Sequence, residues 1–250
     1  MFFLLGVFGV PPVEAASLPP FQVGEKLTYH FYWGIFMVGR GVFEVKEVNK
    51  DGHHVFTVQA QSNEVISLLY PVDAVFHSFF DFQHLRSVHF EQNRSEKRTH
   101  IWEETFFYYQ WGLGSTESYV TGEKKWFEIP KDRAQDKLST IYYMRCLDWG
   151  NRVEASALMG NDKRNYPVVM TKVGTEILTT DDFRPISTFQ VMPNMEYLSG
   201  FVKKGTMTVW VSDDEFKIPV QVKAKLSIGT VSASLVKVEG IKGWPYGLKD

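Results

Sequence analysis

The sequence has a single cysteine, almost no net charge and no long apolar run, and each shortage excludes a class of protein. One cysteine among 250 residues forms neither an internal disulfide nor a thiolate zinc cluster, so an ordinary core must hold the fold. The 27 Lys and Arg residues against 29 Asp and Glu residues leave a net charge of -2, without the cationic excess that drives binding to phosphate backbones. We therefore expect no nucleic-acid partner.

The first residues form a short apolar segment. Residues 2–10 read FFLLGVFGV, about half of the roughly 20 residues that a helix needs to cross a bilayer. The small residues of PPVEAAS follow, with Val13 and Ala15 at the -3 and -1 positions of a cleavage site, although no Lys or Arg precedes the run. The segment predicts a signal peptide over residues 1–16, no transmembrane segment and, because no Cys follows, no lipoprotein anchor. We expect a periplasmic or extracellular protein.

From residue 21 onward the dominant hydrophobic period is two. Residues 27–33 alternate with Leu, Tyr, Phe and Trp on one side, and the alternation is cleanest over residues 218–226. Turn signals such as Lys50-Asp51-Gly52 separate the runs. This pattern predicts an all-β protein, with an antiparallel curved sheet or an open β-barrel or sandwich, as a single exported domain over residues 17–250.

Two segments interrupt the alternation. Residues 63–70 fit either a short helical turn or a strand. Residues 136–149 predict one capping helix, with Asp132 or Asp136 at its start and Gly150 after its end. Its apolar side chains recur at helical spacing and are expected on one face: Leu138, Ile141, Tyr142, Cys146 and Trp149.

Four sequence blocks occur in an order that resembles a known family. They are FQVGEKLTY at residues 21–29, VGRG at 38–41, DKLS at 136–139 running into Tyr142, Tyr143 and Arg145, and VWVSDD at 209–214 with Ile218-Pro219 downstream. Together they resemble domain-of-unknown-function family 3108 over nearly the whole mature chain. The resemblance implies an all-β bacterial protein that is exported to the periplasm or cell surface, and it supplies no catalytic residues.

The sequence contains no catalytic or cofactor motif that we recognise. It has no G-x-S-x-G, P-loop or G-x-G-x-x-G sequence, and its neighbouring acids, such as Glu103-Glu104, fit solvated turns or strand edges. The adjacent His53 and His54 face opposite sides of a strand and cannot share a ligand. We therefore predict no catalytic residues, no metal site and no cofactor.

Aromatic residues are the one excess, at 15% of the chain. Most fall on one side of a strand and fit a core, but residues 106–111 carry aromatics on both sides. Aromatic rings stack on sugars, and a wide apolar concavity holds acyl chains. The candidate ligand-binding residues are therefore Tyr32, Tyr108, Trp111 and Trp126. Arg145 is a fifth candidate, although pairing with a carboxylate on the sheet is the alternative for that side chain.

The leading hypothesis is an exported, non-enzymatic envelope protein that binds an amphipathic ligand, a glycan or a lipid, within an open β-barrel. A hydrolase acting on cell-wall or surface polysaccharide remains an alternative, and so does a structural scaffold whose partner is another envelope protein. An outer-membrane barrel is disfavoured because the strand near residues 217–225 carries a lysine-rich face. The sequence leaves the oligomeric state open.

Overall fold

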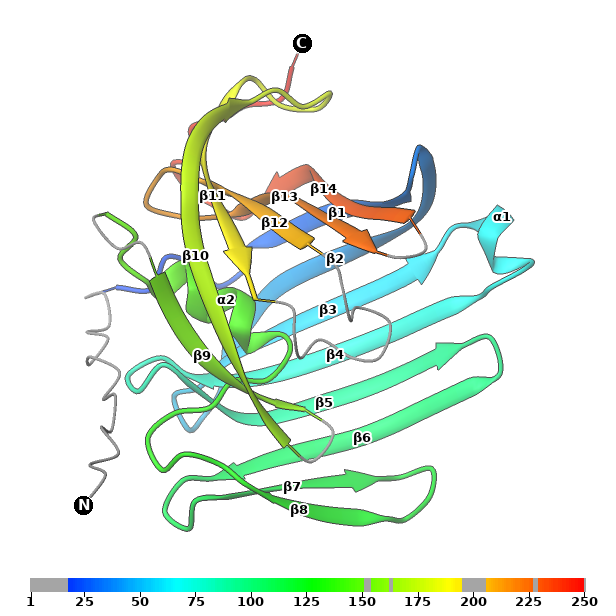
Figure 1. The fold of residues 1–250 in the computed structure, drawn as a ribbon, viewed down its shortest axis with the longest axis vertical. Helices are drawn as coiled ribbons and strands as arrows, with labels where there is room; N and C mark the ends of the chain where they lie inside the picture. Colours follow the sequence, from blue (N-terminus) through cyan, green and yellow to red (C-terminus); the bar gives the residue numbers. More distant parts are fainter. Residues whose placement is uncertain (1–17, 151–153, 162–163, 195–205, 227–228, 250) are drawn as a thin grey trace, which may run out of the picture.

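The computed structural model describes residues 18–150, 154–161, 164–194, 206–226 and 229–249, which form one antiparallel sheet and two short helices (Figure 1). The helices are α1 (Glu64–Ser67) and α2 (Ser139–Cys146). The strands are β1 (Lys26–Trp33), β2 (Phe36–Val48), β3 (His54–Ser62), β4 (Val72–Asp81), β5 (Arg86–Glu96), β6 (Thr99–Tyr108), β7 (Leu113–Ser118), β8 (Lys124–Glu128), β9 (Glu154–Asn161), β10 (Arg164–Leu178), β11 (Ile186–Pro193), β12 (Thr206–Ser212), β13 (Pro219–Leu226) and β14 (Gly229–Glu239). The predicted signal peptide, residues 1–16, lies outside the described residues.

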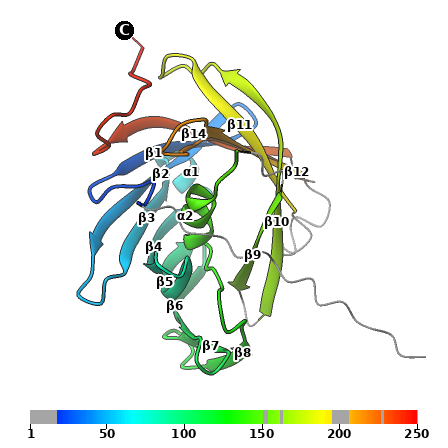
Figure 2. The ribbon, with the colours of Figure 1, turned by 90° about the vertical axis from the view of Figure 1, so that its left-hand side faces the viewer.

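Two meanders are joined into this sheet through a single long-range pairing. The strand order runs β8-β7-β6-β5-β4-β3-β2-β1-β14-β13-β12-β11-β10-β9, so only the β1–β14 pair joins strands that are not neighbours in sequence. The edge strands are β8 and β9, and Figure 2 shows the sheet curling around α2. The predicted all-β class, with an open curved sheet and a capping helix, is confirmed.

Helix α2 is shorter than predicted, and six of its eight residues are buried. It spans Ser139–Cys146 rather than residues 136–149, and Leu147 is already extended. Tyr142 and Tyr143 are each 1% exposed, because the curled sheet surrounds the helix instead of covering one face. The expected single apolar face is therefore wrong for this helix.

The start of α2 is fixed by a buried carboxylate, as the sequence suggested for Asp136. Its Oδ1 accepts hydrogen bonds from the backbone N–H groups of Leu138 and Ser139 at 2.7 and 2.8 Å. Its Oδ2 accepts hydrogen bonds from the hydroxyls of Ser78 on β4 and Ser87 on β5, at 2.6 and 2.5 Å. Asp136 thus ties the helix to two strands.

The segment at residues 63–70 takes the helical alternative. Asn63 accepts a hydrogen bond from the backbone N–H of Ile66 through its side chain, which caps the single turn of α1. Neither α1 nor α2 is long and apolar enough to cross a membrane, and the described residues contain no other helix.

The interior of the curled sheet is largely filled by side chains. One core cluster packs α2 against strands from both meanders, with Phe56 stacked on Tyr142 at 3.5 Å between ring centroids. A second cluster lies around Leu27, Tyr29 and Leu235. Between them lies an apolar cavity of about 70 Å³, far below the roughly 300–1,000 Å³ of a typical ligand pocket.

Candidate ligand-binding face

Strand alternation gives β4–β8 two chemically different faces. Ser78 and Ser87 bond to Asp136 beside α2, so their side chains define the inner face. Phe79 follows Ser78 directly in β4, and its ring stacks on His89 of β5. These two rings therefore lie on the opposite, outer face of the sheet.

A row of directly opposed residues crosses this outer face from β4 to β8. Phe79 pairs with His89, His89 with Phe106, Phe106 with Ser115 and Ser115 with Trp126. The His89 ring is 4.9 Å from the Phe79 ring and 4.2 Å from the Phe106 ring, centroid to centroid, with both pairs stacked. The imidazole is therefore held between two aromatic neighbours.

Three of the predicted ligand-binding residues come together at one end of this row. The Tyr108 ring lies 5.3 Å from the Trp111 ring and 5.7 Å from the Trp126 ring. Trp111 and Trp126 are 62% and 53% exposed and lie against the same ring, so they form a contiguous exposed aromatic patch rather than isolated surface residues. We call Phe106, Tyr108, Trp111 and Trp126 the aromatic platform.

A tight turn places Trp111 on the platform. The backbone N–H of Trp111 donates to the carbonyl of Tyr108 at 3.1 Å, and that of Gly112 donates to the carbonyl of Tyr109 at 3.2 Å. Gly112 has φ +66°, a left-handed conformation that glycine adopts without steric cost. Phe107 and Tyr109 point instead to the inner face and pack with Phe127, so this run is aromatic on both faces as predicted.

A second row on the outer face is acidic. Directly opposed residues run from His77 through Glu91, Glu104 and Glu117 to Lys124. Lys124 pairs with Glu117 at 3.4 Å and also lies over the Trp126 ring. Like charges directly opposite each other destabilise a sheet, so this arrangement costs free energy in the isolated protein.

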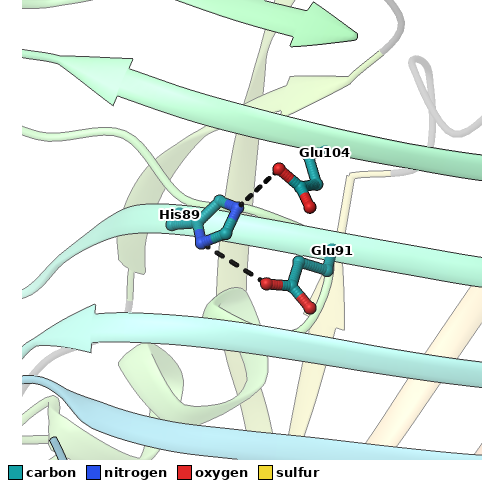
Figure 3. A group of neighbouring side chains, drawn as sticks. All are labelled: His89, Glu91 and Glu104. Atoms are coloured by element: carbon teal, nitrogen blue, oxygen red, sulfur yellow. Dashed lines mark ion pairs between the residues drawn. The ribbon is translucent and has the colours of Figure 1, made fainter. Parts of the chain in front are cut away.

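The two rows meet at His89, Glu91 and Glu104 (Figure 3). His89 Nδ1 is 3.7 Å from a Glu91 oxygen, and Nε2 is 3.7 Å from a Glu104 oxygen. Burial lowers the pKa of His89 despite both carboxylates. Burial also raises the pKa of Glu91; His89 opposes this rise and the charge of Glu104 adds to it.

A second aromatic pair lies beyond the acidic row. The Trp102 and Tyr119 rings are 5.0 Å apart, and the two side chains are 47% and 46% exposed. The neighbouring Glu104 carboxylate raises the pKa of the Tyr119 hydroxyl, which places this pair beside the acidic row. Along the strands, the outer face therefore passes from the aromatic platform to the acidic row and then to this second aromatic pair.

The structure places the other two predicted residues elsewhere. Tyr32 is half-buried on β1, and β2, β3, β4 and β5 separate that strand from β6. Arg145 is fully buried in α2 and forms a two-pronged ion pair with Glu25 at 2.5 and 2.9 Å. Its remaining donors bind the carbonyls of Phe216 and Pro20. Arg145 therefore has the structural role that was its alternative.

Sequence reasoning missed the acidic row and His89. Glu103 and Glu104 are neighbours in sequence but face opposite sides: Glu103 accepts a hydrogen bond from Gln92, while Glu104 lies beside His89. The available signal was the alternation in β5, which puts His89 and Glu91 on one side of the strand. Without the β5–β6 register, however, Glu104 could not be placed opposite them.

The comparisons with known proteins identify a fold and a family. No curated protein sequence matches the chain. A solved structure described as a beta-barrel-like protein of domain of unknown function DUF1849, from Brucella abortus, is similar with a TM-score of 0.61 and 8% identity, covering 88% of this chain and 98% of that one. That likeness concerns the fold alone. A family model described as protein of unknown function DUF3108 matches residues 28–236, well over half of the chain, so the protein belongs to this family.

Proposed function

We propose that this is an exported envelope protein that binds a glycan on the outer face of β4–β8. The observation that carries the proposal is the aromatic platform, where Trp111 and Trp126 flank Tyr108 and remain more than half exposed. Exposed rings of this kind stack on the apolar faces of sugar rings. The proposal includes export because the chain begins with a signal-like segment.

The filled interior favours a glycan over a lipid. An acyl chain needs an enclosed apolar volume, whereas the apolar cavity between the two core clusters measures about 70 Å³. A larger cleft of about 520 Å³ lies around residues 18–22 and 215–217, but charged Glu215, Lys217 and Arg145 contribute to its lining. The aromatic platform instead forms an open surface. We therefore propose the ligand site on the outside of the curled sheet, rather than in the barrel interior that the sequence suggested.

The acidic row limits which glycan fits. Ionised carboxylates accept hydrogen bonds from hydroxyl groups and repel anions. Among the described residues, Glu91 and Glu104 form no ion pair with a lysine or arginine, so no permanent positive charge offsets their negative charge. The ligand that best suits this surface is an uncharged or amino-sugar glycan, not a polyanionic one.

The test is calorimetric titration with oligosaccharides of hexoses and of N-acetylhexosamines. We expect wild-type protein to bind at least one class. W111A and W126A should each weaken binding about 2- to 12-fold, which corresponds to the roughly 0.5–1.5 kcal/mol contributed by one ring contact. The matched control is W33A, since Trp33 is 52% exposed on distant β1. Absence of binding to both classes, or equal weakening by W33A, would contradict the proposal.

The same experiment separates the two alternatives. A hydrolase would shorten the oligosaccharide during titration, with Glu91 and Glu104 as its acids, and E104Q would stop the release of products. A scaffold would bind neither class and would instead co-purify with an envelope protein. Binding without turnover supports the proposed function over both.

A further inference from the structure

We propose that His89, Glu91 and Glu104 form a site for a first-row divalent metal ion such as Zn²⁺ on the outer face of the sheet. Each residue offers one ligand atom such that the three atoms lie within 4.8 Å of one another. One imidazole nitrogen with carboxylate oxygens is a donor set that zinc accepts. This inference does not use the aromatic platform, but a cation bound by Glu91 and Glu104 would offset the negative charge on which the choice of an uncharged or amino-sugar glycan rests.

The spacing of the donor atoms is close to what an ion needs. A tetrahedral ion with ligands at about 2.1 Å holds its donors about 3.4 Å apart. His89 Nε2 lies 3.7 Å from the Glu104 oxygen, which is too long for a hydrogen bond and close to this coordination distance (Figure 3). Small side-chain adjustments would therefore bring the donors into coordination.

His89 also has an orphaned nitrogen at this position. Its Nε2 is shielded from solvent and has no hydrogen-bond partner among the described residues, although a buried polar atom ordinarily has one. Glu91 lies 3.7 Å from Nδ1 in the present arrangement. As the third ligand beside Nε2 and Glu104, it must turn its carboxylate toward the ion, because zinc sites ordinarily have at least three protein ligands.

The ring and the charges around it are arranged for a cation. Phe79 and Phe106 stack on either side of His89 and fix its orientation before any ion binds. Glu117 lies opposite Glu104 and adds negative charge, while Lys124 is engaged with Glu117. A bound divalent ion would relieve the repulsion along this row.

The experiment uses untagged full-length protein, dialysed against a chelator and titrated with ZnCl₂ by calorimetry. We expect one high-affinity site, and about tenfold or greater weakening in H89Q and in E104Q. The matched control is H84Q, because His84 also contacts a carboxylate, Asp81, at 2.7 Å but on an exposed loop. Thermal melts without zinc show whether each variant is folded.

Cobalt binding provides a second, spectroscopic measurement that does not depend on the heat of binding. Co²⁺ at the site should give visible absorption bands of a low-coordinate ion in wild-type protein and in H84Q, and not in H89Q. Should H89Q fail to fold, E91Q tested in the same way must still change the cobalt spectrum or weaken zinc binding. Zinc binding that is absent from wild-type protein, or that survives unchanged in H89Q and E104Q, overturns the proposal.

Discussion

Replacing Arg145 by methionine tests the role that the structure gives this residue. The guanidinium is fully buried, and its NH1 and NH2 groups donate to the two carboxylate oxygens of Glu25, which is itself 0% exposed. Its Nε and NH2 groups also donate to the carbonyls of Phe216 and Pro20, both at 2.9 Å. Methionine keeps much of the volume but removes all of these donors.

The expected loss of unfolding free energy comes from the buried Glu25 carboxylate that remains after the substitution. R145M leaves the Glu25 carboxylate buried without a cation, and breaking a buried pair in this way costs about 3–5 kcal/mol. The double variant R145M/E25M removes the stranded charge, so it should be more stable than R145M by about 1 kcal/mol or more. The loss comes from an unpaired charge rather than from a missing contact.

Urea unfolding followed by tryptophan fluorescence and circular dichroism measures these free energies. The control is K26M, because Lys26 and Glu44 form an exposed pair at 3.4 Å whose loss should cost at most about 1 kcal/mol. A cost below about 1 kcal/mol for R145M, or additive losses in the double variant, would refute the reasoning.

Three further predictions concern the core and the N-terminus. D136A should cost at least about 3 kcal/mol in urea unfolding, since Asp136 accepts four hydrogen bonds in the interior, whereas D136N should cost less because the amide oxygen still accepts the two backbone N–H groups. Burial raises the pKa of the Cys146 thiol to about 12, so a thiol reagent at pH 8 should label it only after unfolding; labelling at the rate of a free thiol would contradict its burial. N-terminal sequencing of protein from the exporting host should start at Ala16 or Ser17, and recovery of intact Met1 in the cytosol would argue against export.

The sequence predicted the strands well because their signal is local. Alternation over residues 27–33 and 218–226 depends on neighbouring side chains, and both segments lie largely within strands. Helix α2 was overestimated at both ends, because periodicity shows which residues are apolar but not where the curled sheet leaves room for a helix.

The candidate site was predictable only in part. Aromatics on both sides of residues 106–111 identified Tyr108 and Trp111, since alternation alone assigns them to faces. The register of β7 and β8 brings Trp126 close to these two rings, and the register of β5 and β6 places Glu91 opposite Glu104. Neither register can be read from one strand alone. The β5–β6 turn sets that register through Lys97 at φ +53°, and nothing in its sequence resembles the Gly or Asn of a usual tight turn.

The most direct test of a glycan site on the outer face is fluorine NMR of protein labelled with 5-fluorotryptophan. Single Trp-to-Phe variants assign the signals, and the oligosaccharide is then added. We predict that the signals of Trp111 and Trp126 shift, while that of Trp149, which is 2% exposed in the core, does not. Unchanged Trp111 and Trp126 signals, or a shift at Trp149 alone, would contradict the proposed site.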